Sequence, residues 1–252
     1  MSEDPADILA EALRARTEPW STILVALDFD GTLTEIQDEP DAPHLTGERR
    51  EILARVPHAT RRLAILSGRS LSDLRSRIGI EGAICVGNHG MEMSGPGLAG
   101  WRAPDGVEDR LSALLASLPA LAGTWIEGKR LTASVHVRPR EDSARHAEVG
   151  RALEGVVERA GFALRSGKAV WEIRPSGALD KGDALLRLMA ELPGVEARRS
   201  VFIGDDTTDE DGFAVLHEGI TALVGPAGRP SRARWRLPDP SAVYRFLEAL
   251  ID

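Results

Sequence analysis

Cysteine is almost absent from the sequence, because Cys85 is the only one among 252 residues. A single cysteine excludes a disulfide within the chain, and its place in a short apolar run, residues 83–86, indicates a buried core thiol. No apolar stretch is long enough to cross a bilayer, and the acidic first residues lack the basic segment that begins a signal peptide. We therefore expect a soluble protein of the cytoplasm.

Basic residues are also in deficit, with 31 Lys and Arg against 39 Asp and Glu, a net charge of −8 and a sequence pI of about 5.4. This balance argues against nucleic acid or an anionic membrane as the main partner. It allows an anionic small substrate, because a bound metal can reverse the local field. The hydrophobic fraction of 42% suffices for the core of one large domain or two modest ones.

The most informative stretch is DFDGTLT, residues 28–34, which follows the apolar run of residues 23–27. The run predicts a buried strand, and Asp28 and Asp30 then lie at its carboxyl end, where ligands bind in open α/β sheets. Two carboxylates this close are unfavourable unless a cation neutralises them or one holds a proton. The stretch therefore predicts a metal site, acid–base chemistry or both. The structural alternative is a polar loop that caps a strand.

Apolar segments alternate with helical patterns before and after this stretch. The segments at residues 62–66, 83–86, 201–203 and 220–224 predict parallel strands, and hence an α/β fold with a Rossmann-like parallel-sheet core. The pattern breaks at the turn cluster of residues 94–97. Residues 95–175 instead show the order α-β-β-α-β-β, which predicts an inserted α+β domain with its helices on one face of an antiparallel sheet. The core is then formed by residues 1–94 and 176–252.

Polar residues follow three of the predicted core strands. They are Asp28 with Asp30, Ser67, and Asp205 with Asp206, and Lys181 opens a helix that could join them. If the strands are parallel, these residues share one edge of the sheet. Carboxylates with several waters suit Mg²⁺, so we expect a magnesium site formed by Asp28, Asp30, Asp205 and Asp206, with Asp206 farther from the ion.

These residue types fit phosphoryl transfer, which needs a nucleophile, a metal and groups that hold the phosphate oxygens. Asp28 can attack phosphorus, and Asp30 can donate a proton to the leaving oxygen and then activate water. Ser67 and Lys181 can hold the phosphate. Each residue alone has an ordinary explanation, as a helix N-cap, a surface lysine or an acidic helix start. The acidic segment that begins at Thr207 also approaches the spacing of an EF-hand calcium loop. An EF-hand loop begins with Asp and follows a helix, whereas this segment begins with Thr and follows a predicted strand.

Together these motifs resemble the haloacid dehalogenase superfamily of phosphatases, and the inserted domain resembles the cap of its sugar-phosphatase branch. Within that branch the resemblance is to the trehalose-6-phosphate phosphatases. It covers the chain from residue 23 onward and rests on the segments SGR (67–69), GNHG (87–90), EIRP (172–175), DKG (180–182) and GDDTTDED (204–211). The resemblance implies Mg²⁺, a phosphoaspartyl intermediate on Asp28, a backbone carbonyl of Asp30 on the metal, and release of trehalose and phosphate.

The inserted domain is expected to determine which substrate is accepted, because sugar hydroxyls must be recognised by polar groups. The resemblance implies that Glu127, Lys129, Lys168 and Glu172 contact the distal glucose. Arg138 is a further candidate on this domain, and the role of His136 is open. Near the core we expect substrate contacts from Gly68, Arg69, Asn88 and His89, although Asn88 and His89 could simply cap their strand.

Three other functions remain compatible with the sequence. The substrate could be another sugar phosphate, such as sucrose phosphate or mannosyl-3-phosphoglycerate. A phospho-accepting receiver-type signalling module also uses an aspartate, a hydroxyl residue and a lysine, but Asp30 and the inserted domain have no place in it. A non-enzymatic calcium-binding domain would need Asp209 and Asp211 as ligands. We expect a monomer that acts on a small sugar phosphate.

Overall fold

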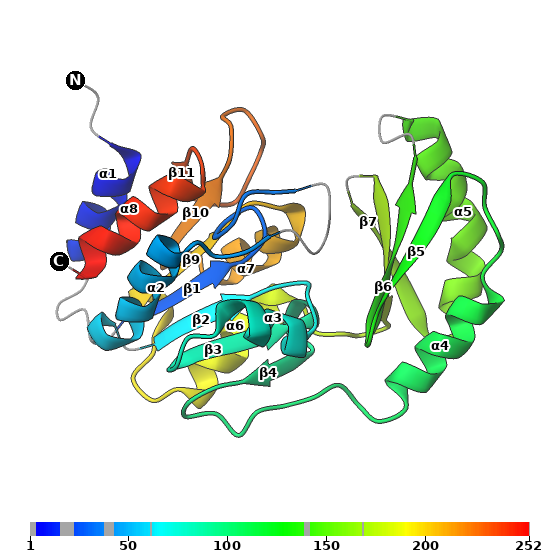
Figure 1. The fold of residues 1–252 in the computed structure, drawn as a ribbon, viewed down its shortest axis with the longest axis horizontal. Coiled ribbons are helices and arrows are strands. Elements are labelled where there is room, and N and C mark those ends of the chain that lie inside the picture. The colour runs from blue at the N-terminus through cyan, green and yellow to red at the C-terminus, as the bar shows by residue number, and fades with distance from the viewer. Residues whose placement is uncertain are drawn as a thin grey trace. The chain divides into compact units, whose positions relative to one another are not determined.

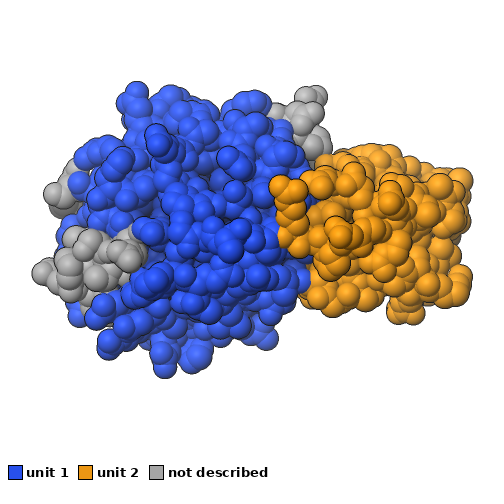
Figure 2. Space-filling view, turned by 90° about the horizontal axis from the view of Figure 1, so that it is seen from below, with its two compact units in different colours: residues 1–101, 179–252 blue, residues 102–178 orange. Residues whose placement is uncertain are grey.

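The computed structural model describes residues 4–15, 23–37, 43–60, 62–138, 142–167 and 169–251. The chain divides into two compact units (Figure 2). Unit 1 comprises Met1–Trp101 and Leu179–Asp252, and unit 2 comprises Arg102–Ala178. Unit 2 is therefore an insertion between the two halves of unit 1.

Unit 1 is built on a seven-stranded sheet with the order β11-β10-β9-β1-β2-β3-β4, parallel except for β4. Its strands are β1 Leu24–Asp28, β2 Arg62–Leu66, β3 Ala83–Gly87, β4 Glu92–Ser94, β9 Ser200–Gly204, β10 Ile220–Val224 and β11 Trp235–Leu237. This confirms the predicted α/β core. Because β1 lies between β2 and β9, the chain passes to opposite sides of β1, and such a switch point is where open α/β sheets bind ligands.

Helices cover both faces of this sheet (Figure 1). One face packs against α1 Pro5–Arg14, α2 Gly47–Ala59, α3 Leu71–Ile78 and α8 Pro240–Ile251, and the other against α6 Lys181–Glu191 and α7 Glu210–Val215. Alternate residues of β1 therefore enter two different cores, which explains why the strand is apolar throughout. The described residues of the unit also form the 3₁₀ turns η2 Asn88–Gly90, η3 Ala197–Arg199 and η4 Thr207–Asp209. None of the described helices is both long and apolar enough to cross a membrane.

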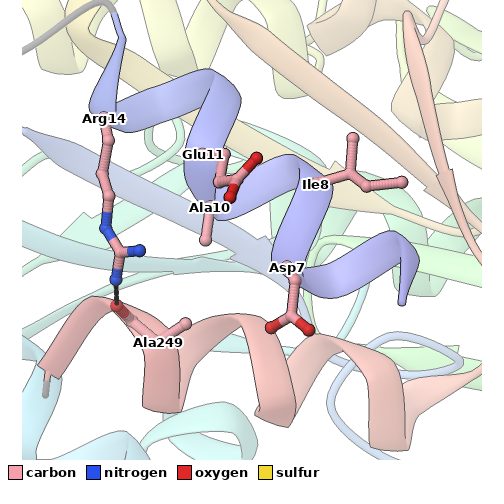
Figure 3. Close-up of a pocket in the computed structure, with 6 residues that line it drawn as sticks. All are labelled: Asp7, Ile8, Ala10, Glu11, Arg14 and Ala249. Atoms are coloured by element: carbon pink, nitrogen blue, oxygen red, sulfur yellow. Dashed lines mark hydrogen bonds between the residues drawn. The ribbon is translucent and has the colours of Figure 1, made fainter. Parts of the chain in front are cut away.

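The first helix is part of the core of unit 1. Its buried residues are Ala6, Leu9, Ala10 and Leu13. Arg14 Nη2 donates a hydrogen bond to the carbonyl oxygen of Ala249 in α8 at 2.9 Å, beside a surface pocket of about 280 Å³ (Figure 3). No residue of the predicted site lines this pocket.

Unit 2 contains a four-stranded antiparallel sheet with the order β5-β6-β8-β7. Its elements are α4 Val107–Ser117, β5 Thr124–Lys129, β6 Thr132–Val137, α5 Ser143–Arg159, β7 Phe162–Gly167 and β8 Val170–Pro175. Both helices lie along the same face of the sheet (Figure 1). Alternate residues of β6, namely Ala133, Val135 and Val137, are buried apolar side chains.

The sequence predicted domain boundaries at residues 94/95 and 175/176. The compact units of the structure divide at 101/102 and 178/179. After β4, the chain folds back so that Met93 and Trp101 exchange two backbone hydrogen bonds, of 3.0 and 3.2 Å. Leu98 and Trp101 then pack on the core of unit 1. Strands β4 and β11 were not predicted, since three residues are too few to show a periodic pattern.

Candidate active site

The carboxylate of Asp28, at the end of β1, is bonded to a buried lysine from the second half of unit 1. Lys181 Nζ donates hydrogen bonds to Asp28 Oδ1 and to Asp209 Oδ1, each at 2.6 Å. Lys181 is the first residue of α6, and the preceding Asp180 forms a capping box with Asp183. The cap fixes where the helix begins and thereby directs Lys181 toward the end of β1.

Three carboxylates gather around this lysine. Asp28, Asp205 and Asp209 each offer an oxygen within 4.8 Å of the others. Asp209 is fully buried, and its Oδ2 accepts hydrogen bonds from the backbone N–H groups of Asp205 at 3.0 Å and Asp206 at 2.9 Å. Within the described ranges, this acidic group contains neither Asp206 nor the side chain of Asp30, both of which we had expected to bind the metal.

Asp209 belongs to this group, although the sequence suggested it only as a ligand of the alternative calcium site. Asp206 and Asp209 form a reciprocal capping box across the 3₁₀ turn η4, which turns Asp209 inward and leaves Asp206 exposed. The spacing of two acids three residues apart just after a strand is a signal for such a cap. It could have indicated that one acid of the pair faces the protein interior.

Burial and mutual repulsion govern the charges in this group. Burial raises the pKa of Asp28 well above its ordinary value, although the nearby Lys181 ammonium opposes the shift. Burial, followed by the charge of Asp209, raises the pKa of Asp205 from 3.8 to about 7. Burial disfavours the Lys181 ammonium, but the charges of Asp209 and Asp28 outweigh it and raise the pKa of Lys181.

The donor set fits a hard divalent cation. Three carboxylates against one ammonium leave an excess of two negative charges when all are ionised. Asp205 Oδ1 is buried and has no hydrogen-bond partner among the described residues, so this acceptor atom lacks a protein donor. Oxygen ligands of this kind suit Mg²⁺.

Gly31 allows the loop after β1 to lie against Asp205. Its φ of +85° lies in the left-handed region, which favours glycine. A Cβ at this position would lie 2.3 Å from Asp205 Oδ2, which is closer than any real contact. The loop is closed by hydrogen bonds from Gly31 N to Thr34 O at 2.8 Å and from Thr34 N to Phe29 O at 3.1 Å.

Asp30 is held by an arginine rather than by the acidic group. Arg69 donates from Nη2 to Asp30 Oδ1 at 2.7 Å and from Nε to Asp30 Oδ2 at 2.8 Å, and its Nη1 contacts Asp73 Oδ2 at 3.1 Å. This two-point contact fixes the carboxylate plane of Asp30. The side chain of Asp30 remains 38% exposed, so water and a small substrate can reach it.

The ends of β2 and β3 add the remaining predicted core residues. Ser67 is buried, and its Oγ accepts a hydrogen bond from Arg69 N at 3.1 Å. Asn88 and His89 follow β3 and are also buried. A Cβ on Gly68 would lie 2.4 Å from His89 Nε2, so this loop and the His89 ring need a glycine to approach each other. Since β3, β2, β1 and β9 are neighbours, their carboxyl ends form one continuous edge.

The described members of the predicted set on unit 2 share the sheet face opposite its helices. Strand pairing places Glu127 opposite Ser134, and Ser134 opposite Glu172, so these side chains form one row. Glu127 Oε2 lies 2.9 Å from His136 Nε2. Lys129 and Arg138 follow on the same face by alternation. Lys168 lies outside the described residues.

An aromatic stack borders this row. The ring of Trp125 stacks on that of His136, with centroids 4.5 Å apart and planes inclined by 7°. The Arg138 guanidinium lies over the Trp125 ring at 4.5 Å. His136, whose role the sequence left open, therefore contacts both Glu127 and Trp125.

Comparison with known proteins gives one consistent family. The family model described as trehalose-phosphatase matches residues 26–241. Trehalose-phosphate phosphatase B of Arabidopsis thaliana is 33% identical over 251 residues, which cover 91% of this chain and 66% of the relative. The trehalose-phosphate phosphatase of Mycobacterium tuberculosis is 32% identical over 262 residues, covering 96% of this chain and 63% of the relative.

Solved structures show the same fold. The C-terminal domain of Candida albicans trehalose-6-phosphate phosphatase superposes with a TM-score of 0.78 at 23% identity, over 98% of this chain and 96% of that one. Aspergillus fumigatus trehalose-6-phosphate phosphatase superposes with a TM-score of 0.66 at 26% identity, over 99% of this chain and 98% of that one.

A protein of Mycobacterium tuberculosis described as an uncharacterized glycosyl hydrolase is 36% identical over 90% of this chain, which spans 18% of that protein.

Proposed function

The chain belongs to the trehalose-phosphatase family, and on that premise we propose that it is a magnesium-dependent phosphatase that hydrolyses trehalose 6-phosphate to trehalose and phosphate. The observation that carries the proposal is the group of buried Asp28, half-buried Asp205 and buried Asp209 around Lys181 at the switch point of the sheet. The chain spans 66% and 63% of the lengths of the two named phosphatases, which is just under two thirds. Their activity is therefore extended to this chain as a proposal.

Asp28 is the proposed nucleophile. Its carboxylate attacks phosphorus, an aspartyl O–P bond forms, and the bond from phosphorus to the sugar oxygen breaks. Burial alone would favour protonated Asp28, which is a poor nucleophile, and the Lys181 ammonium at 2.6 Å favours the ionised form instead. Lys181 thus opposes the protonation of Asp28 that burial favours.

Asp30 is the proposed proton carrier. It donates a proton to the departing sugar oxygen, and then accepts one from the water that attacks the phosphoaspartyl group and regenerates Asp28. The two-point contact with Arg69 holds the Asp30 carboxylate in one orientation beside the end of β1.

Asp28, Asp205 and Asp209 are the groups that would hold Mg²⁺. When bound, the ion would neutralise the excess negative charge and the charge that develops on the phosphoryl oxygens. Asp209 also orients the loop after β9, because its Oδ2 accepts the N–H groups of Asp205 and Asp206. Ser67 is placed to donate its hydroxyl to a phosphate oxygen at the adjacent strand end.

Unit 2 is the proposed specificity domain, or cap. The row of Glu127, Ser134 and Glu172 offers polar groups spaced along one sheet face, as recognition of several sugar hydroxyls requires. Lys129, Lys168 and Arg138 extend the proposed set. We further propose that the protein acts as a cytoplasmic monomer, without a nucleic-acid or membrane partner. The net charge of −8 supports the absence of an anionic partner of either kind.

Phosphate release from trehalose 6-phosphate, with and without Mg²⁺, tests the proposal. We expect multiple turnovers that depend on Mg²⁺ and a loss of at least about 10³-fold for Asp28→Asn, since the amide cannot attack. Full activity of the variant would remove Asp28 as the nucleophile. Sucrose phosphate and mannosyl-3-phosphoglycerate serve as competing substrates, and faster release from either would overturn the assignment to trehalose 6-phosphate.

A further inference from the structure

Glu92 is a buried acid beside the predicted phosphate site. It is the first residue of β4 and pairs with Gly87 at the end of β3. Its Oε2 accepts hydrogen bonds from Asn88 Nδ2 at 2.7 Å and from Leu71 N at 3.3 Å. The carboxylate therefore connects the turn after β3 to the first residue of α3.

The turn that Glu92 holds has an unfavourable backbone. Asn88 and His89 have φ values of 49° and 56°, so two consecutive residues with a Cβ adopt the left-handed region. Such residues persist only where surrounding contacts determine their conformation, and they cluster at functional sites. The hydrogen bond from the Asn88 side chain to Glu92 is one of those contacts.

The same turn holds the loop that carries Ser67 and Arg69. Asn88 N donates to Arg69 O at 2.7 Å, and His89 N donates to Ser67 O at 2.9 Å. The position of the loop therefore follows the conformation of the turn. Arg69 in turn holds Asp30. Leu71 N, which also donates to Glu92, lies two residues beyond Arg69 in the chain, so Glu92 is linked to the loop both through the turn and through the start of α3.

We propose that Glu92 is a positioning residue that fixes the Ser67–Arg69 loop through the left-handed turn at Asn88 and His89. It does not touch the substrate, and it acts by setting the place of the Ser67 hydroxyl and of the arginine that holds Asp30. The inference rests on the proposed phosphatase function, since it assigns Glu92 to that same site. Because the loop belongs to unit 1, Glu92 acts on the phosphate chemistry rather than on the choice of sugar.

Two substitutions separate the hydrogen bonds of Glu92 from its bulk. Glu92→Met keeps the length of the side chain and removes both acceptor oxygens, and we expect kcat to fall about 10- to 100-fold. The fall should be similar for trehalose 6-phosphate and p-nitrophenyl phosphate, and inhibition by inorganic phosphate should weaken. Glu92→Gln keeps one acceptor oxygen, and we expect it to retain most of the activity.

Ser200→Ala is the matched control. Ser200 is buried at the opposite end of β9 and donates to Glu196 O at 2.8 Å, so the variant loses a buried hydrogen bond far along the strand from the site. It should lower Tm without lowering kcat. The proposal would be overturned if Glu92→Met kept the wild-type kcat. It would also be overturned if Glu92→Gln or Ser200→Ala lost as much kcat as Glu92→Met.

Hydrogen exchange supplies a measurement that does not depend on activity. The amides of residues 67–74 should exchange faster in Glu92→Met than in wild type. In Ser200→Ala their exchange rates should equal those of wild type. Unchanged exchange in Glu92→Met would contradict the positioning role. If the wild-type protein released phosphate from none of the sugar phosphates, the proposed function would fail, while the exchange comparison would still decide whether Glu92 holds the loop.

Discussion

The ammonium of Lys181 donates to the carboxylate of Asp28 at 2.6 Å, although the two residues lie 153 positions apart in the chain. Asp28 ends a strand in the first half of unit 1, and Lys181 begins a helix in the second half. All of unit 2 lies between them in the sequence. The pair therefore joins the two halves of unit 1 at the candidate active site.

Lys181→Met should destabilise the protein strongly. The variant leaves the carboxylates of Asp28 and Asp209 buried without their cation, which costs about 3–5 kcal/mol of unfolding free energy in the absence of metal. Phosphate release should fall by at least about 10²-fold, because a charge that favours the ionised nucleophile is lost. Urea denaturation in EDTA measures the first effect. Arg198→Met, on an exposed side chain, is the control and should change stability by no more than about 0.5 kcal/mol.

Asp209→Asn should weaken magnesium binding far more than Asp206→Asn. Asp209 is buried beside Lys181 and Asp205, whereas Asp206 is exposed. We expect at least about a tenfold rise in the Mg²⁺ concentration that gives half-maximal activity for Asp209→Asn, and little change for Asp206→Asn. Calorimetric titration of Mg²⁺ provides the same comparison without substrate. The reverse order of effects would restore Asp206 as the ligand.

Gly31→Ala should inactivate the protein, and Gly228→Ala should not. Both glycines have positive φ values, of +85° and +107°, so both variants carry backbone strain. Only the Cβ at residue 31 meets Asp205 Oδ2, at 2.3 Å, while that at residue 228 has nothing within 4 Å. We expect kcat to fall about 10²-fold for Gly31→Ala, because displaced reacting groups cost that much. Equal losses of kcat would show that strain, rather than the clash, is responsible.

The metal-free protein should become less stable as the pH rises from about 4 to about 7. Asp205 has a pKa of about 7 in the folded chain against an ordinary value of 3.8, so the folded state binds more protons in this window. Unfolding then releases a proton, and the free energy of unfolding falls with rising pH. Thermal melting in EDTA measures the slope, which should be shallower for Asp205→Asn. A slope unchanged by this substitution would exclude Asp205 as its source.

Glu172→Ala should affect a disaccharide phosphate more than a small one. If the polar row of unit 2 recognises sugar hydroxyls, kcat/KM for trehalose 6-phosphate should fall by at least about tenfold more than that for p-nitrophenyl phosphate. Glu154→Ala, at an exposed position of helix α5, is the control and should leave both unchanged. Equal losses on the two substrates would contradict a specificity role.

Much of the fold was predictable from local patterns. Continuous apolar runs indicated the buried parallel strands, and the order α-β-β-α-β-β indicated the antiparallel sheet of unit 2 with helices on one face. The short strand β4 was not predictable, because its three residues carry no period and are defined by pairing with β3. Glu92 could not be recognised for the same reason, since its contacts depend on that pairing.

The sequence by itself determined the kinds of groups at the site and the strand ends that carry them: Asp28, Ser67 and Asp205. Tertiary structure decided which acids converge. Asp206 and Asp209 are the same residue type three positions apart, and only the 3₁₀ turn with its reciprocal cap turns Asp209 toward Lys181 and Asp206 toward solvent. Charge, burial and metal affinity depend on distances of a few ångströms between segments far apart in the chain, and those distances are set by packing.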